Sequence, residues 1–208
     1  MLTILGKSSS INVRKVLWTC EVIGVPYQLM QFGAGTANAL DSPDFLALNP
    51  HGMIPVLIDQ DVVLNESNSI CRYLAAQHQR WDLLPAQASA RAQVEKWMDW
   101  QISDLNSAWR FAFMSLVRKS PLYQDMAMLE HSCTDWNRHM GVIDRHLSTQ
   151  DDFLTGPDFT LADVVIGLSI HRWRSTPMTR PELLHVEAYF DRLRQVVGFS
   201  AHVENGYP

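Results

Sequence analysis

The sequence has few of the features that mark several large classes of protein. Its 208 residues contain only three cysteines, Cys20, Cys71 and Cys133, which lie far apart and form no C-x-x-C pair. An odd, scattered set of thiols is typical of a reducing compartment, so we expect reduced cysteines and a cytoplasmic location. His139 and His146 share a predicted helix, but no carboxylate or cysteine completes a metal set with them, and we expect no metal.

Long apolar runs and basic blocks are also missing. No stretch approaches the ~20 apolar residues that span a bilayer, and the opening MLTILGKSSS has too short an apolar run for a signal sequence. The formal net charge is -5. Without a basic patch to follow a phosphate backbone, nucleic acid is not an expected partner, and neither is a membrane. The 47% hydrophobic content is normal for a globular chain of one large domain or two small ones.

Residues 1–79 alternate between strand and helix patterns. Short β-rich runs at 2–5, at 25–32 and on both sides of Asp59-Gln60-Asp61 predict four strands. Helices are predicted at 11–23, after Ser42-Pro43 and from residue 66. The resulting β-α-β-α-β-β-α order is compatible with a thioredoxin-like domain.

Residues 80–88 break this pattern with Pro85 and small polar residues, which predicts a linker. Residues 89–208 then show helical patterns only. Thr160 and Asp163 form a capping-box variant at the start of one helix, and Gly198 is expected to end the last. The predicted fold class is therefore α+β, with an N-terminal thioredoxin-like domain followed by an all-helical domain.

The helix predicted at 89–118 carries two stripes. One is apolar, as expected of buried core: Val94, Met98, Ile102, Leu105, Trp109, Ala112 and Leu116. The other mixes aromatic side chains with a carboxylate and a hydroxyl: Trp97, Trp100, Asp104, Ser107, Phe111 and Met114. Polar members are costly in a core, so this second stripe indicates a cleft wall or a subunit interface.

Three serines, Ser8, Ser9 and Ser10, lie between the first strand and the first helix. Serine caps helices, because its oxygen accepts a hydrogen bond from an N–H group of the first turn. A cap accounts for one serine but not for Asn12, a second polar residue inside that turn. The junction is therefore a cap, a binding site or both.

Two further stretches combine structural and binding features. In NPHGMIPVL, Pro55 opens a strand-like run; if the Ile54–Pro55 bond is cis, the backbone of Ile54 can pair with an extended peptide, and the alternative is an ordinary trans proline. In LNESNSICRYL, Glu66 and Ser67 stand at a helix start, where N–H groups and the helix dipole favour a carboxylate. Glu66 can bind an ammonium, so the pair suits an α-amino-acid head group; the alternative is a simple helix cap.

Together with FTLADVVIG in the helical part, these motifs resemble those of cytosolic glutathione transferases over nearly the full chain. EKWMDW and SSSINVRKVL look closest to bacterial theta-like or nu-like members. The resemblance implies glutathione as co-substrate, a small electrophile as its target, an electrophile pocket in the helical domain and a homodimer. The alternatives are glutathione-dependent disulfide reduction and a non-catalytic binding module.

The resemblance also implies roles for individual residues. Ser10 donates to the glutathione sulfur, with Asn12 as a second donor. Residues implied in glutathione binding are Ile54, Pro55, Glu66, Ser67, His51, Met53 and Asp104, the last reaching the site of the neighbouring subunit. Trp109, Arg110 and Phe113 are the expected electrophile pocket. Leu40-Asp41 and Met53 replace the polar residues that many relatives use for the glycyl carboxylate, which leaves His51, Arg14 or Arg110 to hold it.

Overall fold

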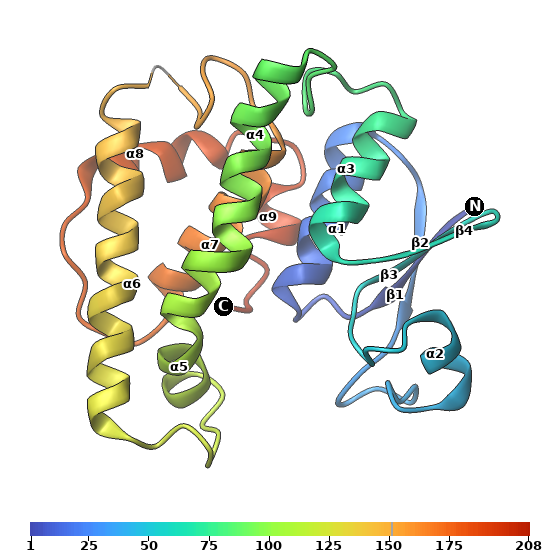
Figure 1. Cartoon of the computed structure of the whole chain (residues 1–208), viewed down its shortest axis with the longest axis horizontal. Helices are drawn as coiled ribbons and strands as arrows, with labels where there is room; N and C mark the ends of the chain where they lie inside the picture. The colour runs from blue at the N-terminus through green and yellow to red at the C-terminus, as the bar shows by residue number, and fades with distance from the viewer. Residues whose placement is uncertain (151) are drawn as a thin grey trace. The chain divides into compact units, whose positions relative to one another are not determined.

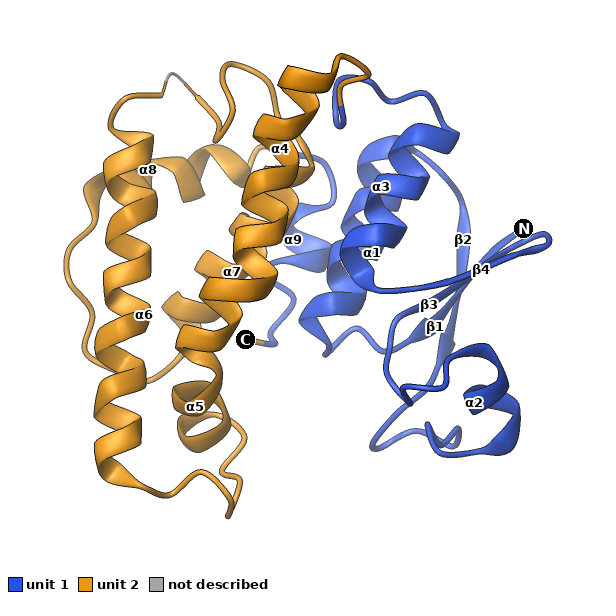
Figure 2. Ribbon diagram, in the orientation of Figure 1, with its two compact units in different colours: residues 1–84, 196–207 blue, residues 85–195, 208 orange. Residues whose placement is uncertain are grey.

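The computed structural model describes residues 1–150 and 152–208, which form two compact units (Figure 2). Unit 1 comprises residues 1–84 and 196–207, and unit 2 comprises residues 85–195 and Pro208. The expected ranges, 1–79 and 89–208, differ from this division because residues 196–207 pack on the first unit. Trp18 Nε1 donates to the carbonyl of Val197 at 2.9 Å, and the Trp18 ring lies edge-on to Phe199 at 5.8 Å.

Unit 1 confirms the predicted thioredoxin-like order. Its strands are β1 (Leu2–Gly6), β2 (Tyr27–Gln31), β3 (Val56–Asp59) and β4 (Val62–Asn65), in the spatial order β2-β1-β3-β4. Its helices are α1 (Ile11–Ile23), α2 (Pro43–Leu48), α3 (Ser67–Gln77) and the short α9 (Phe199–His202). β1 runs parallel to β2 and antiparallel to β3, which is antiparallel to β4.

The sheet is covered on both faces (Figure 1). Leu5 and Val56 are paired neighbours and form a buried cluster with Phe45 of α2. Because side chains alternate across a strand, the next pair, Ile4 and Leu57, points to the opposite face, which α1 and α3 cover. Both members of that pair are fully buried, so the sheet has apolar contacts on each side.

Local signals set the ends of the helices in unit 1. Ser42 Oγ accepts from the backbone N–H of Phe45 at 3.4 Å and Pro43 is the first residue of α2, as predicted. Gly24 ends α1 at φ +82, a conformation that favours glycine. At Gly6 a Cβ atom would lie 2.5 Å from Val13 Cγ2, so the absence of a side chain lets β1 and α1 approach closely.

Unit 2 is helical, as predicted. Its helices are α4 (Ala88–Trp100), α5 (Asn106–Leu116), α6 (Met126–Leu147), α7 (Leu161–Ser175) and α8 (Leu184–Leu193), with a π-helical segment, Gln101–Leu105, between α4 and α5. The described part of the unit has no strand, only an isolated bridge between Phe153 and Gly156.

The π-helical segment corrects the prediction of one regular helix over 89–118. A π turn holds more residues than an α turn, so it shifts which side chains face inward. Gln101 is buried, 1% exposed, whereas Ile102 is 39% exposed. The predicted apolar stripe is therefore right at Val94, Met98, Leu105 and Ala112 and wrong at Ile102.

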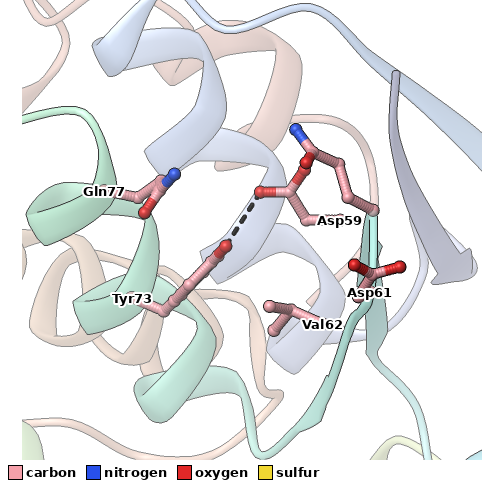
Figure 3. Close-up of a pocket in the computed structure, with 6 residues that line it drawn as sticks. Asp59, Asp61, Val62, Tyr73 and Gln77 are labelled. Atoms are coloured by element: carbon pink, nitrogen blue, oxygen red, sulfur yellow. Dashed lines mark hydrogen bonds between the residues drawn. The ribbon is translucent and has the colours of Figure 1, made fainter.

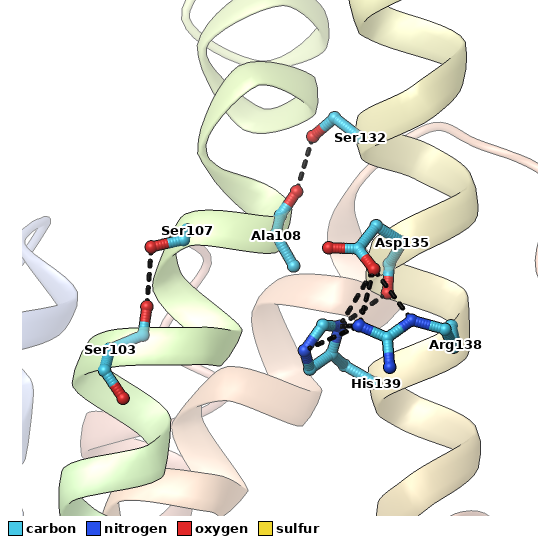
Figure 4. Close-up of polar contacts among 7 residues, drawn as sticks. All are labelled: Ser103, Ser107, Ala108, Ser132, Asp135, Arg138 and His139. Carbon is cyan, nitrogen blue, oxygen red and sulfur yellow. Dashed lines mark hydrogen bonds and ion pairs between the residues drawn. The ribbon is translucent and has the colours of Figure 1, made fainter.

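A side chain of α6 also interrupts the backbone hydrogen bonds of α5. Ser132 Oγ donates to the carbonyl of Ala108 at 2.6 Å (Figure 4). It also accepts from the N–H of Ala112 at 3.0 Å. In a regular helix these two backbone groups would bond to each other. Insertion of the hydroxyl is a recognised cause of helix bending, and the sequence of α5 alone could not reveal it.

The predicted capping box opens α7. Asp163 is fully buried; its Oδ2 accepts from Thr160 N at 2.7 Å and Thr160 Oγ1 at 3.0 Å, and its Oδ1 accepts from Leu154 N at 3.0 Å and Tyr189 Oη at 2.7 Å. Burial raises the pKa of Asp163, and the four hydrogen bonds oppose that rise. One carboxylate thus joins α7, the segment before it and α8.

The prediction that Gly198 ends the last helix is wrong. Helix α8 ends at Leu193, and Gly198, at φ +79, precedes α9. A Cβ atom at Gly198 would lie 2.7 Å from Glu21 Cγ and 3.1 Å from Trp18 Cδ1. Glycine is needed there because the chain passes close to α1. None of the described helices is long and apolar enough to cross a bilayer.

Asp163→Ala is expected to lower the free energy of unfolding by about 3–5 kcal/mol, because it leaves buried donors without an acceptor. Urea unfolding followed by circular dichroism measures the change. Asp158→Ala, at an exposed position of the same loop, is the control and should change stability by less than about 0.5 kcal/mol. A loss at Asp163 no larger than that of the control would contradict the central role of this carboxylate.

Candidate glutathione site

The strand register brings three of the predicted motifs to one end of the sheet. Leu5 of β1 pairs with Val56 of β3, and Val56 pairs with Asn65 of β4. The turn after β1, the Ile54–Pro55 step before β3 and the Glu66–Ser67 pair after β4 therefore all leave the sheet at the same edge. The segment after β2 leaves there too, because β2 runs parallel to β1.

Two helices begin at this edge. α1 starts one residue after Ser10 and α3 starts at Ser67, and the two helices pack against each other. Helix starts carry unpaired N–H groups and a partial positive charge, so both favour an anionic ligand. The arrangement suits a molecule with a thiolate at one point and a carboxylate at another.

Ser10 has the backbone of a helix cap without its side-chain bond. It occupies the N-cap position of α1 with φ -89 and ψ 122, yet its hydroxyl caps nothing. Among the residues that the structure describes, neither the Ser10 hydroxyl nor the side-chain amide of Asn12 has a hydrogen-bond partner. Both side chains are half-buried. Ser10 therefore occupies the cap position of α1 while its hydroxyl remains available for a ligand.

The Ile54–Pro55 peptide bond is cis, so the trans alternative is wrong. The N–H and C=O groups of Ile54 make no hydrogen bond within residues 1–150 and 152–208, although Pro55 beside it is buried. An extended peptide could therefore pair with Ile54 as with the edge of a sheet.

Asn49 fixes the approach to Ile54, and the sequence reasoning missed it. The side chain is 2% exposed; its Nδ2 donates to Met53 O at 2.7 Å, and its Oδ1 accepts from His51 N at 3.2 Å and Asn65 Nδ2 at 3.1 Å. Asn49 thereby links the loop before β3 to the end of β4, directly before Glu66. In the sequence, the sign of this role is the amide of Asn49 next to Pro50 in NPHGMIP.

Glu66 has a strained backbone. Its φ is +68, which side chains other than glycine rarely adopt. The side chain is exposed and makes no ion pair with the described residues, whereas Ser67 beside it is buried, 3% exposed. A strained backbone at an exposed charged residue indicates a function. The sequence pattern does not predict the positive φ of Glu66.

The candidates for the glycyl carboxylate differ in their surroundings. Arg14 is fully buried and its Nη1 donates to three acceptors in the tail: Val203 O at 3.2 Å, Asn205 Oδ1 at 3.1 Å and Tyr207 O at 2.8 Å. Its guanidinium is thus engaged by the tail, and a role of Arg14 at the glycyl carboxylate stays a prediction. His51 is exposed next to Met53, itself 61% exposed, and stays a candidate.

The protein's own thiols are poor nucleophiles. Burial, helped by the nearby Cys71, raises the pKa of Cys20 to about 12. Burial also raises the pKa of Cys71 to about 11, despite the hydrogen bond from Thr19 Oγ1. Burial raises the pKa of Cys133 as well. All three are free thiols, as predicted, and a thiolate at neutral pH would have to come from a ligand.

A pocket of about 240 Å³ lies at the other end of the sheet, at the β3–β4 hairpin (Figure 3). There Tyr73 Oη donates to Asp59 Oδ2 at 2.9 Å, and burial together with that carboxylate raises the pKa of Tyr73. Asp59 pairs with Val62, three residues along each strand from the Val56–Asn65 pair, so this pocket is separate from the motif-bearing edge.

In unit 2, residues of the mixed stripe line two hollows. Trp97 and Trp100 line an apolar one with Lys96 and Val142. A polar hollow of about 370 Å³ is lined by Ser103, Asp104 and Ser107 together with Asp135, Arg138 and His139 of α6. Figure 4 shows five of these six residues, all except Asp104. Asp104 is exposed and its Oδ2 accepts from Ser103 Oγ at 2.6 Å. No cluster of metal-ligating side chains occurs in the described residues of either unit.

The three expected pocket residues of unit 2 lie in unlike surroundings. Trp109 and Phe113 pack edge-on at 5.4 Å, and the Arg172 guanidinium lies 4.6 Å and 4.0 Å from their ring centroids. Phe113 is buried, 3% exposed, so its packing argues against an open pocket wall at this position. Trp109 is half-buried and Arg110 is exposed, and their pocket roles stay predictions.

The chain is similar to known proteins over most of its length. The family model for "Glutathione S-transferase, N-terminal domain" matches residues 9–77. Glutathione S-transferase GstB of Escherichia coli K12 is 34% identical over 197 residues, 94% of each chain. The theta-class glutathione S-transferase of Xanthomonas axonopodis pv. citri, solved with glutathione bound, superposes with a TM-score of 0.89 at 37% identity, over 97% of this chain and 96% of that one.

A relative of another kind is elongation factor 1-gamma 3 of rice, Oryza sativa subsp. japonica. It is 28% identical over 88% of this chain, but the match covers only 44% of the factor. The GstB match, by contrast, runs nearly end to end on both sides. The chain therefore belongs to the glutathione S-transferase family, and its identification from sequence as a glutathione transferase is confirmed.

Proposed function

We propose that this protein activates the thiol of glutathione for attack on small electrophilic molecules. The thiol proton is lost to solvent and the thiolate sulfur forms a bond to an electrophilic carbon. The leaving group departs with the bonding electron pair. A free thiol has a pKa of about 8.5, so the protein's task is to increase the thiolate fraction at neutral pH.

The proposal rests on the Ser10 hydroxyl, which has no hydrogen-bond partner among the described residues. A donor placed at a helix start stabilises an adjacent anion by hydrogen bonding and by the helix dipole. Ser10 is the donor to the sulfur and not a nucleophile. Asn12, whose amide has no partner in the described chain, is the second donor.

The other residues of the edge hold the tripeptide. Glu66 binds the ammonium of the γ-glutamyl group, and Ser67 with the start of α3 binds its carboxylate. The free N–H and C=O groups of Ile54 pair with the cysteinyl backbone, with Pro55 and Met53 on either side. His51 holds the glycyl carboxylate.

One observation favours a second activity. The Ser10-x-Asn12 pair offers two hydrogen-bond donors to the sulfur in this proposal, which also suits glutathione-dependent reduction of disulfides. The similarity to the elongation factor covers only 44% of that protein and fits the alternative of a non-catalytic binding module only weakly. Retention on glutathione resin, followed by a screen of haloacids, aryl halides, epoxides and mixed disulfides, distinguishes all three. Failure to bind glutathione would refute the proposal.

Assembly and location complete the proposal. We place the protein in the cytoplasm, as a detoxifying homodimer. The exposed Asp104 beside the polar hollow supports the dimer, because a carboxylate there is accessible to a second chain. Trp109 and Arg110 contribute to the electrophile pocket.

Ser10→Ala is expected to lower turnover by about 10²-fold, because one donor to the anion is lost. The thiol of bound glutathione should titrate at higher pH, measured by thiolate absorbance in the ultraviolet. Ser9→Ala is the matched control, with turnover like that of the wild type. Equal titration curves for Ser10→Ala and wild type would remove Ser10 from the mechanism.

Glu66→Gly is expected to have opposite effects on stability and binding. Glycine relieves the positive φ and should raise the free energy of unfolding by about 1 kcal/mol. Loss of the carboxylate should weaken glutathione binding by about 10–100-fold in calorimetry. Glu66→Gln keeps the side-chain length and should weaken binding without gaining stability. Wild-type affinity in both variants would reduce Glu66 to a helix-start residue.

Light scattering should give about 47 kDa, twice the 23.7 kDa chain, as two-fold association requires. Asp104→Asn should weaken glutathione binding while this mass is kept, because the carboxylate serves the neighbouring site. Ser103→Ala removes only the hydroxyl that contacts Asp104 and is the control. A monomer with full glutathione affinity would contradict both the dimer and the role of Asp104.

A further inference from the structure

The C-terminal tail of unit 1 is fastened to the second turn of α1. Arg14 lies four residues after Ser10, and its backbone N–H donates to Ser10 O at 2.9 Å, the first hydrogen bond of the helix. Its guanidinium is fully buried and donates to the carbonyls of Val203 and Tyr207 and to Asn205 Oδ1. A buried charge is stable only when it is well paired, so this contact determines where the tail lies.

Asn205 extends that contact to the Ser8–Ser10 turn. Its Oδ1 accepts from Arg14 Nη1 at 3.1 Å and from Tyr207 N at 3.3 Å. Its Nδ2 donates to the carbonyl of Ser8 at 3.2 Å. One amide therefore connects α1, the tail and the turn that precedes Ser10, across 197 residues of sequence.

The turn has few other restraints. Ser10 N donates to Lys7 O at 3.0 Å and closes the turn locally. Within the described chain, the bond from Asn205 is the one hydrogen bond that reaches the peptide groups of residues 8–10 from outside the turn and α1. Because the Ser10 hydroxyl makes no cap bond, its direction depends on this backbone.

We propose that Asn205 is a positioning residue, which holds the Ser8–Ser10 turn so that the Ser10 hydroxyl is aimed at the glutathione sulfur. The inference rests on the proposed function of Ser10 and adds that the end of the chain is part of the thiol-activating machinery. Asn205 touches neither substrate nor sulfur; it acts through Ser10 alone.

A double-mutant cycle tests this dependence. The thiolate absorbance of bound glutathione and the turnover with an aryl halide are measured across pH for wild type, Asn205→Ala, Ser10→Ala and the double variant. Asn205→Ala should shift the thiol titration to higher pH and lower turnover by about tenfold, because a misplaced donor is a weaker one. In the Ser10→Ala background the same substitution should change neither.

Two further variants guard against an effect on folding. Asn205→Asp keeps an oxygen for Arg14 and removes the donor to Ser8, so the tail stays fastened. The new charge acts equally in both backgrounds, and the cycle therefore cancels it. Tyr207→Phe is the matched control in the tail, because the backbone carbonyl of Tyr207 is the group that reaches Arg14; it should titrate like the wild type.

The outcomes separate the two levels of the proposal. If Ser10→Ala itself leaves the titration unchanged, the proposed function of Ser10 fails and the role of Asn205 fails with it. If Ser10→Ala shifts the titration but both Asn205 variants behave like wild type, the role of Asn205 alone is refuted. The same holds if their effects persist in full in the Ser10→Ala background, since that result marks a structural role.

Discussion

The antiparallel pairing of β3 with β1 is the constraint on which the site depends. It sets Val56 opposite Leu5, and β4 then continues the register with Asn65 opposite Val56. A slip of β3 by one residue would turn Leu57, which is fully buried, to the opposite face of the sheet and disturb its packing there. Because the register is fixed, three segments that are distant in sequence leave the sheet at one edge. The groups that we propose to bind glutathione are thus placed by hydrophobic packing that involves none of them.

Polar groups differ between the two units in how fully they are hydrogen-bonded. Asp163 of unit 2 has four hydrogen-bond donors around one buried carboxylate, an arrangement that stabilises structure. At the edge of unit 1 the opposite holds: the Ser10 hydroxyl caps nothing, the backbone of Ile54 pairs with nothing in the described chain, and Glu66 holds a positive φ. Unsatisfied and strained groups cost stability, so their concentration at one edge indicates selection for binding.

The sequence predicts the structure well where the signals are local. Helix caps depend on a few neighbouring residues, so Ser42, Gly24 and the Thr160–Asp163 box were all recognisable, as were the motifs around Ile54 and Glu66. What depends on distant contacts was missed. The hydroxyl of Ser132 enters α5 from another helix, and the π turn moves Ile102 outward. Gly198 resembles a helix end but is required by the close approach of Glu21. No periodicity encodes such contacts, because they arise only after the elements pack.

The most distant of these contacts explains why the tail belongs to unit 1. Arg14 lies on the buried face of α1, where its charge needs hydrogen-bond acceptors. The tail provides two carbonyls and an amide oxygen, so docking of the tail and burial of Arg14 stabilise each other. Once the tail is held for that reason, the amide nitrogen of Asn205 lies next to the turn before Ser10. A contact needed for stability near one end of the chain thereby reaches the turn before Ser10, the residue that we propose as the donor to the glutathione thiol.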